Sequence, residues 1–286
     1  MTTNISGKTR ICGLIGDPVE HTMSPAMHNA AFNKLGLDYA YVAFRVKAAE
    51  LDKAIEGIRA LNMRGLNVTI PHKVAVMKLL DKLDLMAEKI GAVNTIVNDD
   101  GVLTGYNTDA TGFLQPLLEK STELKGKEVA ILGAGGASRG ISFILAERGA
   151  NLTIVNRDSS RAADLAGRIS QTFGSKAIAL SLTHDNLAKV LKAVDVVVNA
   201  TPVGMSPSVG ESPVPAGLLR PGLVVYDIVY NPVKTGLLRE AEAAGAETIS
   251  GIDMLVWQGA LAFEKWTGKK PPVKLMKAEA LKILEQ

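Results

Sequence analysis

A glycine-rich segment between a short apolar run and a helical pattern constrains the fold of this chain most. Apolar residues 129–132 precede it, residues 138–148 have a helical pattern, and the segment itself reads Gly133-Ala134-Gly135-Gly136-Ala137-Ser138. Glycines let a backbone turn tightly and approach a ligand closely, and a helix N-terminus presents free N–H groups to phosphates. Between a strand and a helix, these residues predict a dinucleotide-binding loop. Ser138 stands where the usual pattern has Gly or Ala, so the fit is imperfect.

Strand-like and helix-like patterns alternate along the rest of the chain. The first series has apolar runs at 11–15, 39–46, 66–69 and 92–97, and helical patterns at 25–35, 48–61 and 73–80. The second series has apolar runs at 129–132, 151–155, 194–199 and 223–228, and helical patterns at 138–148, 161–172 and 237–244. Such alternation predicts α/β domains with mostly parallel sheets. The second series has the layout of a doubly wound Rossmann domain.

The length of 286 residues agrees with two domains, at roughly 100–200 residues each. We predict a substrate-binding and catalytic α/β domain made of residues 1–110 plus 250–286, and a nucleotide-binding Rossmann domain of residues 111–249. The tail from Gly251 onward is helical except for a break at 268–272. Its helices are expected to pack back on the first domain.

The residues after the second strand of the Rossmann series favour NADP over NAD. An NAD site carries Asp or Glu about twenty residues after the glycine loop, where it binds the ribose 2′-OH. Here Asn156 and Arg157 follow the strand, and Arg161 comes four residues later. A guanidinium matches a 2′-phosphate in charge and geometry. Asp158 is an acid in the same place and weakens this preference.

Polar residues of the first domain cluster where predicted strands end, which is where open α/β sheets bind ligands. Thr22 and Ser24 follow the first strand, and Ser24 before Pro25 fits a helix N-cap as well as a ligand contact. Lys73 lies just past the third strand at a predicted helix start, where the helix dipole disfavours a cation. Lys73 and Asp109 would form an acid–base pair if they converge. On spacing alone, each could equally be a turn residue or a solvated charge.

Nine sequence blocks, in order, resemble the shikimate dehydrogenase family over nearly the whole chain. They are GDPVEHTMSPAMHN from Gly16, GLNVTIPHK from Gly65, GAVNT from Gly91, GYNTD from Gly105, GAGGASR from Gly133, NRDSSR from Asn156, NATPVGM from Asn199, YDIVYNP from Tyr226 and GIDMLVWQ from Gly251. The resemblance implies reversible NADPH-dependent reduction of 3-dehydroshikimate to shikimate, in the biosynthesis of chorismate and the aromatic amino acids.

The resemblance also implies roles for individual residues. Lys73 and Asp109 would be the catalytic pair. The substrate would be held by Thr22, Ser24, Asn67, Thr69, Lys73, Asn94, Asp109, Tyr230 and Gln258. The cofactor would be bound by Gly133, Ala134, Gly135, Gly136, Ala137, Asn156, Arg157, Arg161, Thr201, Ile228, Gly251 and Met254.

Three alternatives stay open at this point. A quinate/shikimate dehydrogenase that uses NAD is opposed by Asn156, Arg157 and Arg161. It is left open by Asp158 and by Thr22, which stands where many family members have Ser. A non-catalytic NADP-sensing protein would lack the acid–base pair. A folate-type dehydrogenase has no support from the NVTIPHK and GYNTD blocks. No histidine clusters with an acid and a serine as in a hydrolase triad, and we interpret His21, His28 and His72 as structural.

Composition limits the other classes of partner. The net charge of +3 is small and spread out, which argues against nucleic-acid binding. The single cysteine, Cys12, has no partner for a disulfide, and no Cys/His cluster has metal-ligand spacing. The N-terminus lacks the apolar region of a secretory signal, and no run approaches the ~18 apolar residues of a membrane span. We therefore expect a cytoplasmic enzyme with a small-molecule substrate. A homodimer is compatible with the sequence, which does not determine the oligomeric state.

Overall fold

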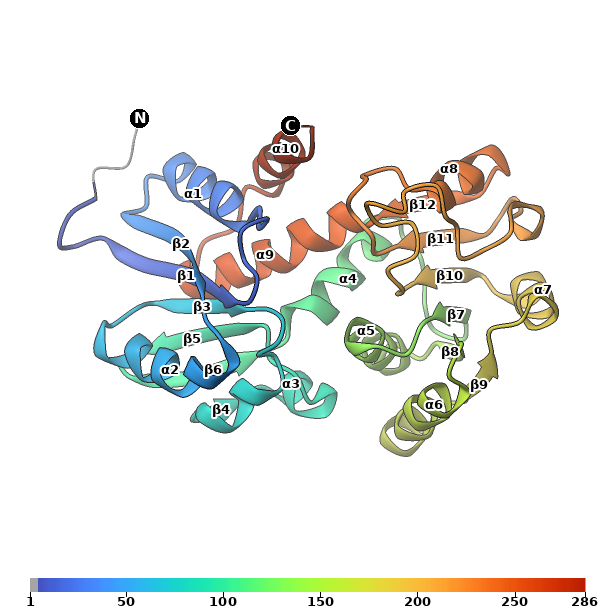
Figure 1. Ribbon diagram of the computed structural model, residues 1–286, viewed down its shortest axis with the longest axis horizontal. Coiled ribbons are helices and arrows are strands. Elements are labelled where there is room, and N and C mark those ends of the chain that lie inside the picture. The colour runs from blue at the N-terminus through green and yellow to red at the C-terminus, as the bar shows by residue number, and fades with distance from the viewer. Residues whose placement is uncertain (1–4, 286) are drawn as a thin grey trace. The chain divides into compact units, whose positions relative to one another are not determined.

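The computed structural model describes residues 5–285. The chain divides into two compact units: the first runs to Gly112 and resumes at Val256, and the second is Phe113–Leu255. Each unit contains a six-stranded sheet with helices packed against it (Figure 1). The chain passes between the units within two helices, α4 (Thr108–Glu119) and α9 (Gly251–Thr267). The predicted class, two α/β units with mostly parallel sheets, is confirmed.

The first unit has the strand order β2-β1-β3-β5-β6-β4. Its strands are β1 (Arg10–Gly16), β2 (Tyr39–Arg45), β3 (Gly65–Val68), β4 (Lys82–Leu83), β5 (Thr95–Asp99) and β6 (Val102–Tyr106). Its helices before α4 are α1 (Ser24–Lys34), η1 (Ala48–Glu50), α2 (Leu51–Ala60), η2 (Ala75–Leu79) and α3 (Leu85–Ile90). Among the strands described for this unit, only β5 runs against its neighbours, β3 and β6.

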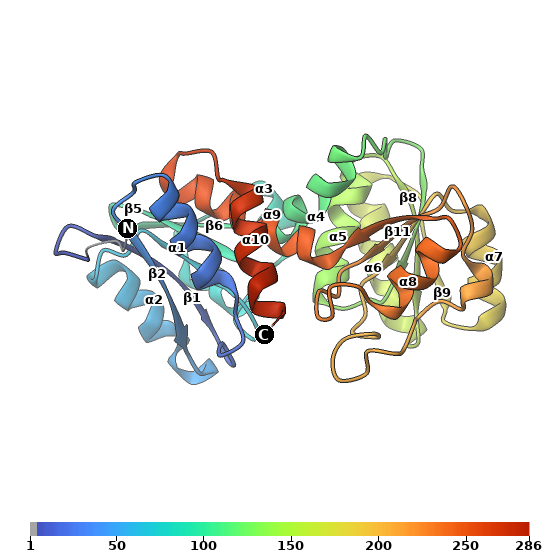
Figure 2. The ribbon, with the colours of Figure 1, turned by 90° about the horizontal axis from the view of Figure 1, so that it is seen from above.

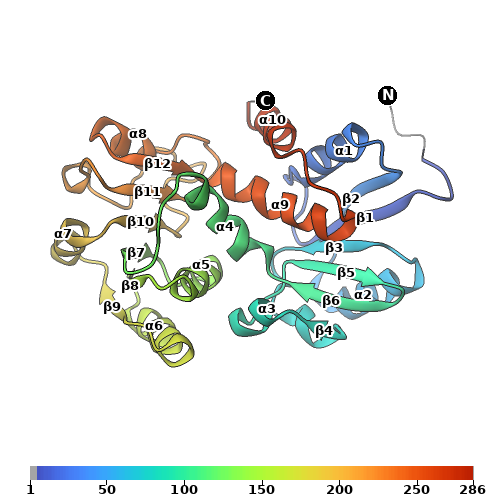
Figure 3. The same ribbon diagram turned by 180° about the vertical axis from the view of Figure 1, so that it is seen from behind.

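The reversal of β5 comes from a tight hairpin that the periodicity did not predict (Figure 3). Asp100 and Gly101 join β5 to β6 with φ angles of 53° and 89°. Both angles are positive, and an Asp-Gly pair between apolar runs is a strong hairpin signal. Because β5 is reversed, its first residue Thr95 pairs with Asn67 of β3 and with Tyr106 of β6. The start of β5 therefore lies at the sheet edge where β3 and β6 end.

The second unit has the strand order β12-β11-β10-β7-β8-β9, and all of its strand pairs are parallel. The strands are β7 (Glu128–Leu132), β8 (Asn151–Asn156), β9 (Ala177–Ser181), β10 (Val196–Asn199), β11 (Val224–Asp227) and β12 (Glu247–Ser250). The helices are α5 (Gly136–Glu147), α6 (Ser159–Phe173), α7 (His184–Ala193), η3 (Ala216–Leu218) and α8 (Gly236–Ala243). This is the strand order of a doubly wound dinucleotide-binding fold.

Helix α9 from Val256 onward and α10 (Val273–Leu284) belong to the first unit, as predicted for the tail. Helix α10 lies beside α1 (Figure 2) and buries Met276 and Ala280. Trp266 of α9 is 1% exposed, and its Nε1 donates a hydrogen bond of 2.9 Å to the Ile96 carbonyl in β5. A buried indole satisfied by a strand carbonyl ties this helix to the reversed strand.

Candidate active site

Lys73 and Asp109 form an ion pair in the first unit. Lys73 Nζ donates a hydrogen bond of 2.6 Å to Asp109 Oδ2, and the two side chains are 34% and 25% exposed. Asp109 lies in the first turn of α4, where the helix dipole favours a carboxylate. Lys73 lies in the turn before η2 and not at a helix start, so the predicted conflict with a helix dipole does not arise. The pair is open enough to meet a small molecule.

Asn94 holds the other oxygen of Asp109. Its Oδ1 accepts a hydrogen bond of 2.7 Å from the Thr108 backbone N–H. An N–H cannot accept, so the amide group is fixed with Nδ2 on the opposite side. That Nδ2 donates to Asp109 Oδ1 at 2.8 Å. Asn94 is 3% exposed, so this orientation is set inside the protein.

A chain of buried hydrogen bonds continues from Asn94 to β2. The Tyr41 hydroxyl donates to Asn67 Oδ1 at 2.7 Å, and Asn67 Nδ2 donates to Thr95 Oγ1 at 3.1 Å. Thr95 Oγ1 lies 2.9 Å from the hydroxyl of Thr108, which also contacts Asn94. Sequence reasoning missed Tyr41, Thr95 and Thr108 as site residues. Thr95 and Thr108 lie within the GAVNT and GYNTD blocks, which were the available signal.

A histidine, His28, packs against Tyr41 at the β2 end of this chain of hydrogen bonds. The ring of His28 stacks on Tyr41 with the ring centres 4.4 Å apart and the planes 10° apart. It is fully buried, and within residues 5–285 neither ring nitrogen has a hydrogen-bond partner. Burial lowers the pKa of His28 to about 3, which keeps the ring neutral. Its role is to pack against Tyr41, in agreement with the structural interpretation from sequence.

Thr22 and Ser24 lie in the connection from β1 to α1. The Ser24 backbone N–H donates to Thr22 Oγ1 at 3.3 Å, and Ser24 is 6% exposed. The N-cap interpretation of Ser24 is wrong: Met23 precedes the helix, and no side chain caps it. The Ser24 hydroxyl is therefore not used by the first turn of α1.

The other residues predicted to bind substrate lie in both units. Thr69 directly follows β3 and is partly exposed. Gln258 of α9 lies against Gly112 of α4, where an added Cβ would come within 2.6 Å of the Gln258 backbone nitrogen. Gly112 is one helical turn after Asp109, so this close approach brings the Gln258 backbone near the start of α4. Tyr230 follows β11 in the second unit and is 40% exposed.

The glycine loop of the second unit has the expected strand–loop–helix context. Gly133 has a φ of 108°, which other residues rarely adopt, and a Cβ there would come within 3.0 Å of the Ala200 carbonyl oxygen. Ser138, which departs from the usual pattern, is fully buried, and its hydroxyl donates to the Gly133 carbonyl at 2.6 Å. The serine that departs from the usual pattern therefore joins the end of the loop, at Ser138, to its beginning, at Gly133.

The N-terminus of α5 is open toward solvent. Gly135 occupies the N-cap position, and no side chain caps the helix. A Cβ added to Gly135 or Gly136 would meet nothing within 4 Å, and Ala137 beside them is exposed. Ala134 in the same turn is partly exposed. Free N–H groups beneath open space suit a pyrophosphate.

The residues predicted to select NADP lie at the end of β8 and the start of α6. Asp158 caps α6, since its Oδ1 accepts from the Ser160 backbone N–H at 3.0 Å, and its Oδ2 lies 3.5 Å from Arg161 Nε. A hydrogen bond from the Ser160 hydroxyl is the main cause that lowers the pKa of Asp158. Asn156 Nδ2 donates to the Asp158 carbonyl, and Arg157 is exposed. Asp158 therefore caps α6 and also forms an ion pair with Arg161, one of the residues predicted to bind the 2′-phosphate.

Four further residues predicted to bind the cofactor follow the strands β10, β11 and β12. Thr201 comes after β10, and its Cγ2 lies 3.1 Å from where a Gly133 Cβ would be. Ile228 comes after β11 and is partly exposed. Gly251 begins α9 against the Ile228 backbone, which leaves no room for a Cβ, and Met254 follows in the first turn.

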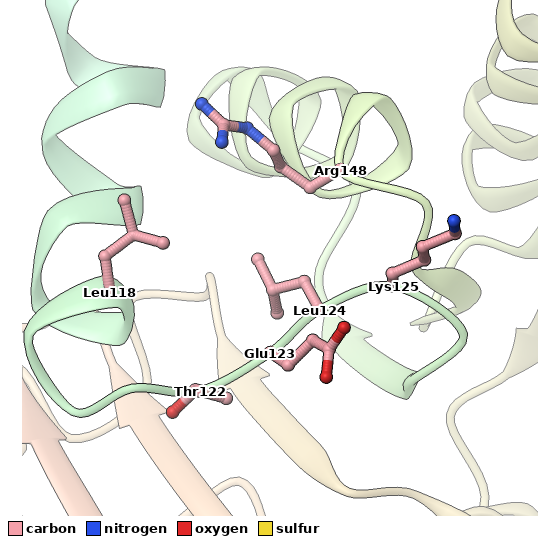
Figure 4. Close-up of a pocket in the computed structure, with 6 residues that line it drawn as sticks. All are labelled: Leu118, Thr122, Glu123, Leu124, Lys125 and Arg148. Carbon is pink, nitrogen blue, oxygen red and sulfur yellow. The ribbon is translucent and has the colours of Figure 1, made fainter.

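A cavity of about 220 Å³ lies elsewhere in the second unit (Figure 4). It is lined by Leu118, Thr122, Glu123, Leu124, Lys125 and Arg148. These residues lie before β7 and at the end of α5, away from the carboxyl ends of the strands, and none is a predicted site residue. Within residues 5–285 no group of three His, Cys, Asp or Glu side chains could hold a metal ion. No helix in this part of the chain is long and apolar enough to cross a membrane.

Three family models match the chain. Residues 14–96 match the shikimate dehydrogenase substrate binding domain, and residues 116–220 match shikimate / quinate 5-dehydrogenase. Residues 251–281 match the shikimate 5'-dehydrogenase C-terminal domain. The matches cover both units, and they include the segments that carry Lys73 and the glycine loop.

Known proteins are similar over nearly the whole length. A relative from Methanopyrus kandleri named shikimate dehydrogenase (NADP(+)) is 50% identical over 99% of each chain. The structure of shikimate 5-dehydrogenase from Listeria monocytogenes in complex with shikimate and NAD is 45% identical, with a TM-score of 0.93 over 97% of this chain and 98% of that chain. A shikimate dehydrogenase in complex with NADP+ is also 45% identical, with a TM-score of 0.92 over 99% and 98%.

Proposed function

Because the chain belongs to the shikimate dehydrogenase family, we infer that it is an NADP-dependent shikimate dehydrogenase. It reduces 3-dehydroshikimate reversibly to shikimate, a step in aromatic amino-acid biosynthesis. The observation that carries this inference is the Lys73–Asp109 ion pair of 2.6 Å, in a chain 50% identical to a named relative. A non-catalytic NADP-sensing protein would not need to retain that pair.

The first unit supplies the residues proposed to hold the substrate. The hydroxyls of Thr22 and Ser24 would bind the substrate carboxylate. The ring hydroxyls would be bound by Thr69, Asn94, Asp109 and Gln258. Asn67 contacts Tyr41, Thr95 and the Asn94 carbonyl. We propose that it orients these neighbours toward the substrate, and that Tyr230 also contacts the substrate.

The acid–base step uses Lys73. When NADPH is bound, its nicotinamide supplies the hydride that reduces the C3 carbonyl carbon of the substrate. Negative charge then develops on the carbonyl oxygen, and the Lys73 ammonium donates a proton to it. Asp109 Oδ2 accepts a hydrogen bond from Lys73 and aims it, while Asn94 keeps Oδ1 in place. A positioned general acid of this kind contributes about 10²–10⁴-fold to the rate.

The second unit supplies the proposed cofactor site. The open N-terminus of α5 would receive the pyrophosphate, and the two arginines near the start of α6 would bind the 2′-phosphate. Ile228, Gly251 and Met254 would lie on the nicotinamide side, and Thr201 would also contact the cofactor. The NAD-dependent quinate/shikimate dehydrogenase is the second candidate, because Asp158 pairs with Arg161 at the site proposed for the phosphate.

Initial rates with shikimate or quinate, each against NADP+ or NAD+, test the proposal. We expect strong turnover with shikimate and NADP+ and weak turnover in the other three combinations. Better turnover with quinate and NAD+ would move the protein to the second candidate. Binding of NADP+ without turnover in any combination would support the sensing protein instead.

The remaining sequence predictions concern assembly and location. A homodimer, the absence of nucleic-acid binding and a cytoplasmic location stay predictions. Light scattering of the purified chain and titration with duplex DNA would test the first two. Fractionation of the source cells would test the third.

A further inference from the structure

Asp227 is a buried carboxylate that the proposed mechanism does not use. It is the last residue of β11 and is 0% exposed. Within residues 5–285 no Lys, Arg or His forms an ion pair with it. Burial raises the pKa of Asp227, and hydrogen bonds to its oxygens act in the opposite direction. A buried charge without a cation is costly unless it is well hydrogen-bonded, so the placement of this carboxylate calls for a physical reason.

Three donors from three segments converge on Asp227. The Thr235 hydroxyl donates to Oδ2 at 2.6 Å, and the Val229 backbone N–H donates to Oδ1 at 3.0 Å. Asn199 Nδ2 donates to Oδ1 at 2.9 Å. Thr235 also caps α8 by accepting from the Leu238 backbone N–H. The carboxylate thus joins the ends of β10 and β11 to the start of α8.

Asn199 passes this constraint to the next segment. It is the last residue of β10 and pairs in parallel register with Asp227. Because its Nδ2 faces a carboxylate, its Oδ1 must face the other way. There it accepts from the Thr201 backbone N–H at 3.0 Å and from the Thr201 hydroxyl at 2.6 Å. Nδ2 also donates to the Val203 carbonyl at 3.2 Å, so both ends of segment 200–203 are held.

Segment 200–203 in turn packs against the glycine loop. A Cβ on Gly133 would lie 3.0 Å from the Ala200 carbonyl oxygen and 3.1 Å from Thr201 Cγ2. The Ala200 backbone N–H donates to the Leu132 carbonyl at 2.9 Å, directly before the loop. A shift of this segment would therefore move the Ala200 and Thr201 atoms against which the glycine loop packs.

We propose that Asp227 is a positioning residue for NADP. Its carboxylate orients the Asn199 amide, and Asn199 holds segment 200–203 against the loop that contains Gly133. The cofactor then meets a loop whose shape is set before it binds, which lowers the cost of binding. This inference rests on the proposed function, because that function assigns NADP to the loop.

The test compares Asp227→Ala with Asp227→Asn in the full-length chain. NADP+ dissociation constants come from calorimetric titration, and shikimate KM and thermal midpoint are measured on the same samples. Asp227→Ala should raise the NADP+ Kd about tenfold or more, because Asn199 loses its acceptor, and should leave the shikimate KM within about twofold. Asp227→Asn should stay within about threefold of the wild-type Kd, since its oxygen can still accept from Asn199 and Val229. A wild-type Kd for Asp227→Ala would overturn the proposal.

A matched control separates positioning from general loss of stability. Asp195 directly precedes the same strand, β10, at its opposite end, and accepts from the Glu128 backbone N–H and from Lys127 Nζ, each at 3.0 Å. Asp195→Ala should lower the thermal midpoint and leave the NADP+ Kd unchanged. An equal rise in Kd for Asp195→Ala would overturn the proposal, because the effect would then not depend on the glycine loop.

Asn199→Ala keeps the measurement decisive if Asp227→Ala does not fold. It cuts the link to segment 200–203 while the Thr235 and Val229 bonds to the carboxylate remain. Its NADP+ Kd should rise as for Asp227→Ala, and an unchanged Kd would contradict the proposal. Failure of the proposed function is seen separately, as a wild-type chain that binds NADP+ but does not oxidise shikimate.

Discussion

Each unit contains an asparagine hydrogen-bonded to an aspartate, and the two pairs differ in the role we propose for them. In the first, Asn94 Nδ2 donates to Asp109 Oδ1 at 2.8 Å, and in the second, Asn199 Nδ2 donates to Asp227 Oδ1 at 2.9 Å. In each pair the asparagine oxygen accepts a backbone N–H and a hydroxyl from one threonine. The amide orientation is therefore locked in the same way at both places.

The difference is the partner of the second carboxylate oxygen. Asp109 Oδ2 accepts from Lys73, and both side chains are partly exposed. Asp227 Oδ2 accepts from the Thr235 hydroxyl and is fully buried. A partly exposed cation can exchange protons with a substrate, whereas a buried hydroxyl cannot. We infer from this comparison that the Asn–Asp pair is a common support, and that the partner of the second oxygen distinguishes a site suited to acid–base chemistry from one suited to positioning.

The largest effect is expected from Lys73→Met, which removes the cation and keeps the apolar stem. The kcat for shikimate oxidation should fall about 10²–10⁴-fold, because the proton on the carbonyl oxygen loses its carrier. Initial rates at saturating substrate measure this, and an unchanged NADP+ Kd is the control. A kcat within a few-fold of wild type would show that Lys73 does not carry the proton. The Lys73–Asp109 pair would then not differ in chemistry from the pair in the second unit.

The same substitution at both aspartates tests the comparison directly. Asp109→Asn places an amide nitrogen against either Lys73 or Asn94, both of which are donors, so kcat should fall about 10²-fold. Asp227→Asn can turn its nitrogen toward the Thr235 hydroxyl, which can accept, so kcat should change by less than about threefold. Steady-state kinetics on the two variants decide the matter. Equal losses would mean that the two pairs do not differ in use.

Stability in acid should depend on His28 in the first unit. The pKa of His28 is lowered to about 3, against an ordinary value near 6.5, so the unfolded chain binds the proton more readily. Its contribution is complete above about pH 6.5 and is lost as the pH falls toward 3, on the order of 2 kcal/mol at pH 5. Thermal midpoints between pH 7 and pH 4 measure this, and His28→Leu should flatten the curve. An unaltered curve would show that other groups cause the loss.

Asp227 should act on stability with the opposite sign. Its pKa is raised by burial, so its contribution is greatest below its ordinary range and falls as the pH rises through the raised value. Asp227→Asn should therefore gain stability relative to wild type between pH 4 and pH 7. A relative loss over that range would contradict the direction of the pKa shift.

The smallest effect is expected from Asp158→Ser. Serine can still cap α6, while the carboxylate that pairs with Arg161 is removed. The KM for NADP+ should fall about two- to fivefold, and the KM for NAD+ should change less. The expected change is small because exposed charges interact weakly. Steady-state kinetics with each cofactor measure both values. A selective gain for NAD+ would show that Asp158 does not oppose the phosphate.

Local patterns in the chain predicted much of the architecture. The glycine loop beside an apolar run predicted the Rossmann unit, and the break at 268–272 predicted two terminal helices. The edge strand β9 was missed: residues 177–180 are apolar, but the strand is only partly buried and was not predicted as a strand. The hairpin at Asp100 and Gly101 had a readable turn signal that periodicity alone did not use.

The candidate site residues also divide into those that the sequence named and those that only the structure brought together. Lys73 and Asp109 are 36 residues apart in sequence, and motif resemblance named both. Asp227 lies inside the YDIVYNP block, but no pattern in that block shows that its carboxylate is fully buried. Tyr41, Thr95 and Thr108 were likewise ordinary strand and helix residues until the reversed strand β5 placed them together.

The sequence by itself determined the fold class and the strand–loop–helix context of the glycine loop, and its motifs named Lys73 and Asp109, because turn chemistry, side-chain periodicity and family motifs are carried by neighbouring residues. Only the tertiary structure decided which oxygen of each aspartate meets which donor. That depends on register between strands far apart in the chain, such as Asn199 beside Asp227 across 28 residues. Burial and the direction of an amide group are set by all the segments that surround a side chain, so one enclosed carboxylate becomes a support and the other, beside an accessible lysine, can take part in chemistry.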